Sequence, residues 1–140
     1  MKRWICALLA AALLALSVPA LAAGSGLKEA IMVYEDYDGN RAEQTIDDEP
    51  TLAELAEMLK RAKKNPGQLD GCTMNSTLFC VVPSGEIYDF SVATDGCPYI
   101  VDMDNNKTYT LSAEDQARLW EIFDLVQETM GYDANSVLNW

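Results

Sequence analysis

The chain contains no histidine, few basic residues and only one long hydrophobic run. Without histidine it lacks the side chain that most often serves as general base and as transition-metal ligand. Its 10 basic residues stand against 22 acidic ones, a net charge of −12. This excess of negative charge repels nucleic acid and anionic membranes. We therefore expect no nucleic-acid partner and no cofactor.

The single hydrophobic run lies at the N-terminus. Lys2 and Arg3 precede an apolar segment over residues 5–16, and Ala20-Leu21-Ala22 has the small-x-small pattern of a cleavage site. The segment is short for a membrane span, which needs about 20 residues. Residues 1–22 are predicted to be a cleaved signal peptide, and a retained membrane anchor is the alternative.

Cleavage after Ala22 leaves residues 23–140, a length suited to one compact domain. It removes two basic residues and Cys6, so that 8 basic residues face 22 acidic ones, a net charge of −14. No second apolar run follows, and we expect no stable membrane span after cleavage. The product is predicted to be secreted or held in the cell envelope, with an unknown protein or small ligand outside the cell as its partner.

Residue patterns along the mature chain predict an α+β fold. We expect an antiparallel sheet of about 5–6 strands packed against two helices, in the order β-β-α-β-β-β-β-α. Helical spacing of apolar residues favours a first helix over residues 48–64, with Lys63 and Lys64 in its last turn, and a closing helix over residues 112–130. The strands are expected at residues 31–35, 41–46, 77–82, 86–92, 99–103 and 107–110.

The hairpin around Pro83-Ser84-Gly85 allows a prediction of strand register. A two-residue loop at Ser84-Gly85 would mix apolar and polar side chains on one face, which a half-buried sheet avoids. A three-residue loop with Gly85 in the left-handed position pairs apolar residues instead. The predicted core face then consists of Leu78, Cys80, Val82, Tyr88, Phe90 and Val92.

That register also predicts which cysteines can form a disulfide. Cys97 falls opposite Gly71, one step from Cys72, and a bulge at a neighbouring glycine would bring the two sulfurs together. Cys80 lies roughly 27 Å away along the strand, too far for a disulfide, which needs Cα atoms within about 7 Å. We predict a Cys72–Cys97 disulfide and a free, buried thiol at Cys80.

Metal binding has weak candidates in the first turn. Asp36, Asp38 and Asn40 alternate oxygen ligands that suit Ca²⁺, as in the start of a calcium loop. The glycine and the distal acid that complete an EF-hand loop are absent, and hairpin turns favour the same residue types. We therefore expect no metal site.

Catalytic motifs are also missing. No Cys-x-x-Cys pair is present, the serines of the hairpin have no histidine partner, and no spacing singles out a carboxylate pair such as Glu86 and Asp89. We therefore favour a protein without catalytic activity and keep an enzyme as the alternative.

The segment from Cys72 to Met130 resembles small secreted or lipoprotein-type domains of Gram-positive bacteria. The likeness rests on a hairpin followed by Asp95-Gly96-Cys97, then Tyr109 and Leu111, and then the closing helix. It implies an exported α+β module closed by a disulfide, without known catalytic residues. Cys80 is a departure from that pattern.

Two functions follow as hypotheses. The first is an exported, non-enzymatic binding or interaction module of the cell envelope or extracellular space. Its surface would involve Tyr37, Tyr132 and Trp140, or the polar edge strand over residues 41–46.

The alternative is a small-ligand carrier or hydrolase with a pocket between sheet and helices. Tyr88 and Trp120 could line that pocket. A deep pocket with converging carboxylates would favour this alternative, whereas a filled core with a flat apolar patch would favour the first hypothesis.

Overall fold

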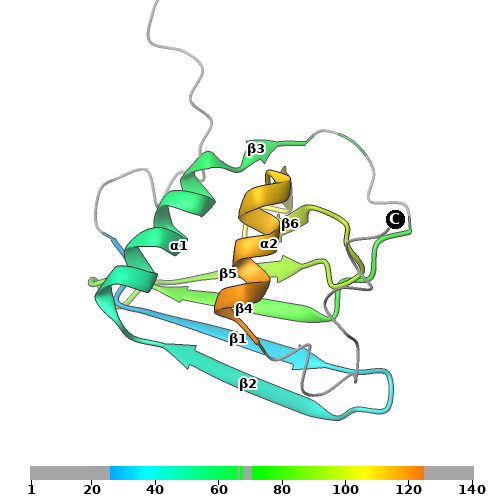
Figure 1. Ribbon diagram of the computed structural model, residues 1–140, viewed down its shortest axis with the longest axis horizontal. Helices are drawn as coiled ribbons and strands as arrows, with labels where there is room; N and C mark the ends of the chain where they lie inside the picture. Colours follow the sequence, from blue (N-terminus) through cyan, green and yellow to red (C-terminus); the bar gives the residue numbers. More distant parts are fainter. Residues whose placement is uncertain (1–25, 66, 68–70, 125–140) are drawn as a thin grey trace, which may run out of the picture.

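One antiparallel sheet with two helices makes up the computed structural model, which describes residues 26–65, 67 and 71–124 (Figure 1). Within these residues the sheet has seven strands. The elements are β1 (Glu29–Glu35), β2 (Arg41–Ile46), α1 (Glu49–Arg61), β3 (Lys63–Lys64), β4 (Ser76–Val81), β5 (Ile87–Val92), β6 (Tyr99–Asp102), β7 (Lys107–Thr110) and α2 (Ala113–Ile122). The predicted α+β class is confirmed, with one strand more than expected.

The additional strand is β3, at one edge of the sheet order β2-β1-β4-β5-β6-β7-β3. Lys63 pairs with Thr110 and Lys64 with Tyr109. The prediction that these lysines lie in the last turn of α1 is therefore wrong. The backbone leaves the helix at Ala62, with φ −57° and ψ 132°, and the two lysines find backbone partners on β7 instead.

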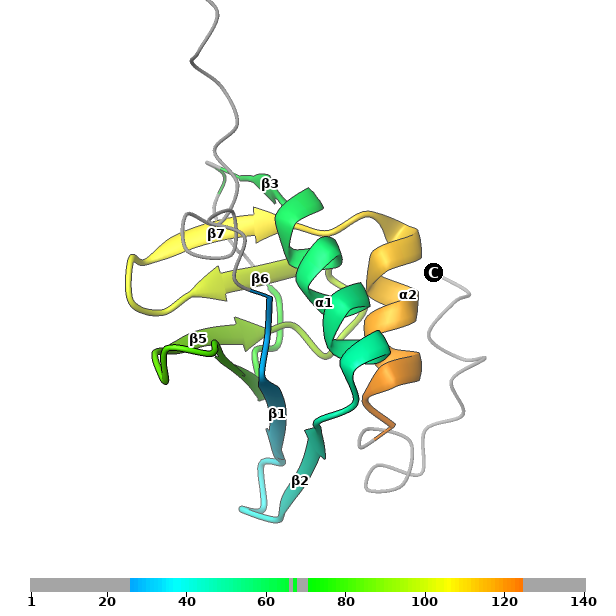
Figure 2. The same ribbon diagram turned by 90° about the vertical axis from the view of Figure 1, so that its left-hand side faces the viewer.

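Both helices lie on the same side of the sheet (Figure 2). Each begins at a capping residue at the predicted start of the helix. Asp48 accepts a hydrogen bond from the backbone N–H of Thr51, and Ser112 accepts one from that of Asp115. α1 follows the edge strand β2 and leads to the opposite edge strand β3, and α2 follows β7. The helices thus cross one face of the sheet together.

The described part of α2 ends at Ile122, earlier than the predicted end at Met130. Gln44 of β2 explains this end. Its side-chain nitrogen donates to the carbonyl of Ile122 (2.9 Å) and its oxygen accepts from the N–H of Asp124 (3.0 Å). The strand thereby satisfies backbone groups that another helical turn would have used. Residues 125–140 lie outside the described residues.

The register of the β4–β5 hairpin is the predicted one. Leu78 faces Phe90 and Cys80 faces Tyr88. Gly85 has φ +87°, the left-handed position expected at the end of the three-residue loop, and its N–H donates to the carbonyl of Val82 (2.9 Å). The predicted core face is buried except for Tyr88, which is half-buried.

The core fills the space between this face and the helices. Strand β1 contributes Ala30, Met32 and Tyr34, while Ile31 and Val33 point to the opposite side of the sheet. The largest fully buried side chains are Tyr34, Phe90, Phe123, Met32, Leu55, Met58, Leu59, Leu78, Ile100 and Leu119. No helix within the described ranges is long and apolar enough to cross a membrane.

Candidate binding surface

The disulfide joins Cys72 and Cys97, as predicted, with their Cα atoms 6.0 Å apart. Gly71 and Gly96 have φ of +87° and +84°, so the chain turns at a left-handed glycine just before each cysteine. Asp95 fastens the same end of the sheet, because its carboxylate accepts from the N–H groups of Thr73 and Cys97. The disulfide thus closes the open end of the β4–β5 hairpin.

Cys80 is free and completely buried in the core. Burial raises the pKa of its thiol far above the usual range. A thiol that stays protonated and out of reach of solvent is a poor nucleophile. Cys80 is therefore a packing residue in this fold.

The candidate calcium residues form a hydrogen-bonded turn between β1 and β2. One oxygen of Asp36 accepts from the N–H groups of Asp38 (2.9 Å) and Asn40 (2.8 Å), and the other from the Asn40 side-chain amide (2.8 Å). The Asn40 side chain is the main cause that lowers the pKa of Asp36. These bonds occupy the carboxylate that a cation would need.

Acidic and sulfur side chains converge elsewhere in the described part of the chain only at Cys72, Asp95 and Cys97. Two of these three side chains are joined in the disulfide. Their sulfurs are therefore not thiolate ligands for a metal ion.

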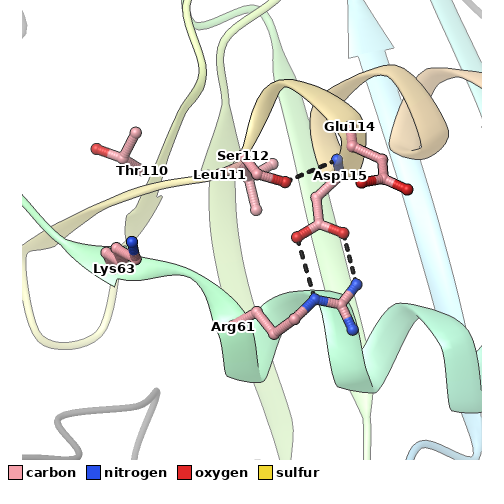
Figure 3. Close-up of a pocket in the computed structure, with 7 residues that line it drawn as sticks. All are labelled: Arg61, Lys63, Thr110, Leu111, Ser112, Glu114 and Asp115. Atoms are coloured by element: carbon pink, nitrogen blue, oxygen red, sulfur yellow. Dashed lines mark hydrogen bonds and ion pairs between the residues drawn. The ribbon is translucent and has the colours of Figure 1, made fainter.

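A depression of about 760 Å³ lies where α1 meets β7 and the start of α2 (Figure 3). The two hydrogen bonds between Arg61 and Asp115, of 2.5 and 3.3 Å, cross it, and Ser112 is engaged in its capping bond. Arg61 lowers the pKa of Asp115, so this carboxylate is a paired anion. Among the carboxylates that line the depression, Asp115 is therefore already paired with Arg61.

The residues predicted to line a pocket are not part of this depression. Tyr88 and Trp120 are half-buried and pack against the hydrophobic core. The depression is instead lined by Arg61, Lys63, Thr110, Leu111, Ser112, Glu114 and Asp115. The geometry gives little support to a buried site for a small ligand.

The opposite face of the sheet carries no helix in the described part of the chain (Figure 2). We call it the open face. Register places Ile31 beside Phe79, and Val81 beside Ile87. Ile87 is 55% exposed and Met103 is 54% exposed, although both are large and apolar. The apolar side chains of the open face include Ile31, Phe79, Val81, Ile87, Val101 and Met103.

Glu29 pairs with Val81 on this face, and a second carboxylate, Asp89, lies within the apolar area. It lies opposite Phe79 on β4, and its backbone carbonyl accepts from the N–H of Met103 (2.9 Å). Its Oδ1 is enclosed and has no hydrogen-bond partner among the described residues. Burial raises the pKa of the Asp89 carboxyl, and the negative charge of Asp104 raises it further.

The structure separates the predicted surface residues from the open-face centre. Tyr37 is 87% exposed in the β1–β2 turn, at the disulfide end of the sheet, whereas Ile87 follows the β4–β5 turn at the other end. The edge strand β2 is exposed, and Arg41 and Glu43 form an ion pair along it (3.3 Å). Tyr132 and Trp140 lie outside the described residues.

Sequence reasoning identified the buried face of the hairpin and missed the significance of the other face. The signal was present, because alternation leaves Phe79, Val81 and Ile87 opposite the predicted core face. Apolar residues on both faces of a strand indicate that both faces of the sheet are buried in the functional protein. Glu86, the sequence partner of Asp89 in a carboxylate pair, is exposed in the turn.

The fold and surface together define a class of protein: an α+β domain with one helix-covered sheet face, a second face that no helix of the described residues covers, and a disulfide at one end. Comparison of the chain with protein-family models, curated proteins and solved structures finds no match. The resemblance to small exported domains of Gram-positive bacteria stays a prediction.

Proposed function

We propose that this chain is an exported, non-enzymatic binding module that acts in the cell envelope or outside the cell. The observation that carries the proposal is the open face. Its exposed Ile87 and Met103 lie on a sheet whose other face is already packed against both helices. Large apolar side chains exposed on an otherwise unoccupied sheet face are typical of interaction sites in soluble domains.

Export is supported by the leader pattern over residues 1–22 and by the disulfide. A bond between Cys72 and Cys97 persists in oxidising compartments and is rare in the cytosol. Fractionation of the producing cell, with mass analysis of the exported chain, tests this part. We expect a product that begins at Ala23, and an uncleaved chain in the cytosol would contradict it.

Binding through the open face is tested by position-specific photo-cross-linking in the producing cell. One variant carries the photoreactive residue in place of Ile87, and a control carries it in place of Ala53, which is exposed on α1. We expect an adduct of defined mass from position 87 and none from position 53. Equal adducts from both positions, or none from either, would refute the proposal.

A carrier or hydrolase remains the second hypothesis from the sequence, but no observation favours it. The carboxylate of Asp115 is held by Arg61, and Asp89 lies on the other side of the sheet from that depression. The binding module is therefore the function that the geometry supports best.

A further inference from the structure

The centre of the open face differs chemically from its surroundings. Asp89 has Phe79 as its neighbour on β4 and Met103 on the other side, after β6. Ile87 lies two residues earlier on the same strand. Asp89 thus has Ile87 on one side along its own strand and the polar Ser91 on the other, with the apolar Phe79 and Met103 beside it on the neighbouring segments.

This carboxylate has no counter-charge in the described part of the protein. No ion pair involves Asp89, and the charged group that acts on it most is another acid, Asp104. Oδ1 of Asp89 is enclosed without a hydrogen-bond partner among the described residues, whereas the side chain as a whole is only half-buried. A half-buried, unpaired anion destabilises the free domain and is best explained by a partner that neutralises it.

We propose that the open face binds a protein segment that presents a lysine or arginine between apolar side chains, with the basic group on Asp89. The apolar side chains of the partner cover Ile87, Phe79 and Met103, and its cation pairs with the Asp89 carboxylate. The inference rests on the proposed function, because it names the class of partner for that same surface.

The charge of this chain argues against two other occupants of the open face, namely its own residues 125–140 and a second copy of the chain. Residues 125–140 of this chain contain Glu128 and Asp133 but neither lysine nor arginine, so the tail has no cation for Asp89. A second copy would bring a net charge of −14 against another −14. Of the basic side chains, Arg41, Lys60, Arg61 and Arg118 are also already in ion pairs. A separate basic partner fits the surface best.

The geometry suggests the spacing of the partner's side chains. Ile87 and Asp89 are two residues apart on one strand, a separation of roughly 6.8 Å. An extended segment of the pattern apolar-x-basic-x-apolar repeats this spacing on one of its faces. It can therefore place its cation on Asp89 while one of its apolar residues contacts Ile87.

The probe is a synthetic peptide library of that pattern, with lysine or arginine at the central position and the x positions varied. It is applied to the exported chain, purified with its disulfide intact, and peptide affinities are measured by fluorescence anisotropy. Asp89→Asn is the test variant. Asp38→Asn, in the exposed β1–β2 turn at the other end of the sheet, is the control for the same change in net charge.

We expect library peptides that bind the native chain and lose about tenfold or more in affinity with Asp89→Asn. Affinity for the Asp38→Asn control should change by less than about threefold, because that turn is remote from the site. Replacing the central lysine of a selected peptide by glutamate should abolish binding to the native chain. Asp89→Lys should restore binding of the glutamate peptide, a rescue that a folding defect cannot produce.

Three results would overturn the inference. They are a library without any binder, equal affinity for native chain and Asp89→Asn, and equal binding of lysine and glutamate peptides. Repeating the position-87 cross-linking with Asp89→Asn separates this failure from that of the proposed function. If the adduct persists unchanged, the open face binds a partner but the basic class is wrong.

The cross-linked product also identifies the other occupants. An adduct within the chain to residues 125–140 would show that the tail covers the face, and an adduct between two copies would show self-association. Either result would overturn the proposal that the open face binds a separate basic partner. An adduct with an unrelated protein supports the proposal only if the cross-linked peptide carries a lysine or arginine and its yield falls with Asp89→Asn.

Discussion

Asp89 and Phe79 face each other across β4 and β5 on the open face, while the next pair along the strands, Leu78 and Phe90, is fully buried under the helices. Moving one residue along the two strands leads from the filled core to the face that no described helix covers. The position of the Asp89 carboxylate on that face is therefore set by the strand register and not by an ion pair.

Asp89→Asn should stabilise the free domain at neutral pH. Because the pKa of Asp89 is raised in the folded state, ionisation costs more there than in the unfolded chain. The cost is absent below the unfolded value near 3.8, grows as pH rises through the folded pKa and is then constant. We expect the free energy of unfolding to rise by up to about 1 kcal/mol at pH 7. Urea unfolding of both proteins from pH 3 to pH 8 measures this change.

The control for this experiment is Asp38→Asn, which removes a charge from an exposed turn and should change stability little at any pH. A destabilising effect of Asp89→Asn at neutral pH would contradict the description of Asp89 as an unpaired anion.

Asp115→Asn should have the opposite effect. Its pKa is lowered, chiefly by the hydrogen bonds from Arg61, so its contribution to stability is present above the unfolded pKa and is lost as pH falls through the folded value. Because Arg61 is largely exposed, the loss should be about 1 kcal/mol. Urea unfolding at pH 7 and pH 3 measures it, and Glu121→Gln, at the exposed end of the Arg118 pair, should cost less.

Removal of the disulfide should lower the free energy of unfolding by about 2–4 kcal/mol, because the unfolded chain gains the freedom of the 25-residue loop. The double variant Cys72→Ser with Cys97→Ser tests this by thermal and urea unfolding. The single variant Cys72→Ser should show a similar loss and leave Cys97 reactive. An unchanged midpoint would mean that the bond does not constrain the unfolded chain.

Cys80 should be unreactive in the folded protein. Burial encloses the thiol and raises its pKa, so a thiol reagent can reach it only after unfolding. We expect no alkylation of the exported chain in native buffer and a single alkylated site in denaturant without reductant. Mass mapping of the labelled peptide checks the position, and labelling of residue 72 or 97 in place of 80 would contradict the pairing.

Local patterns were sufficient for much of the fold. The glycine of the Pro83-Ser84-Gly85 loop determines the register, and that register brings Cys72 to Cys97 and leaves Cys80 in the core. Helix starts were also predictable, because Asp48 and Ser112 cap their own helices through bonds within three residues.

Helix ends and the additional strand were not predictable in this way. Lys63 and Lys64 have the charge expected of a helix C-terminus, yet they pair with β7, which lies more than forty residues away in sequence. The end of α2 likewise depends on Gln44 of β2, separated from Ile122 by 78 residues. A local pattern contains no information about such partners.

The sequence by itself determined the alternation of side chains on each strand, the turn geometry and, through them, which cysteines can meet, because these depend on residues close together in the chain. Only the tertiary structure decided which face of the sheet the helices cover. Both faces offered apolar side chains, and the path of α1 from β2 to β3 covers one of them. Asp89 is on the other because the helices occupy the face where Phe90 packs.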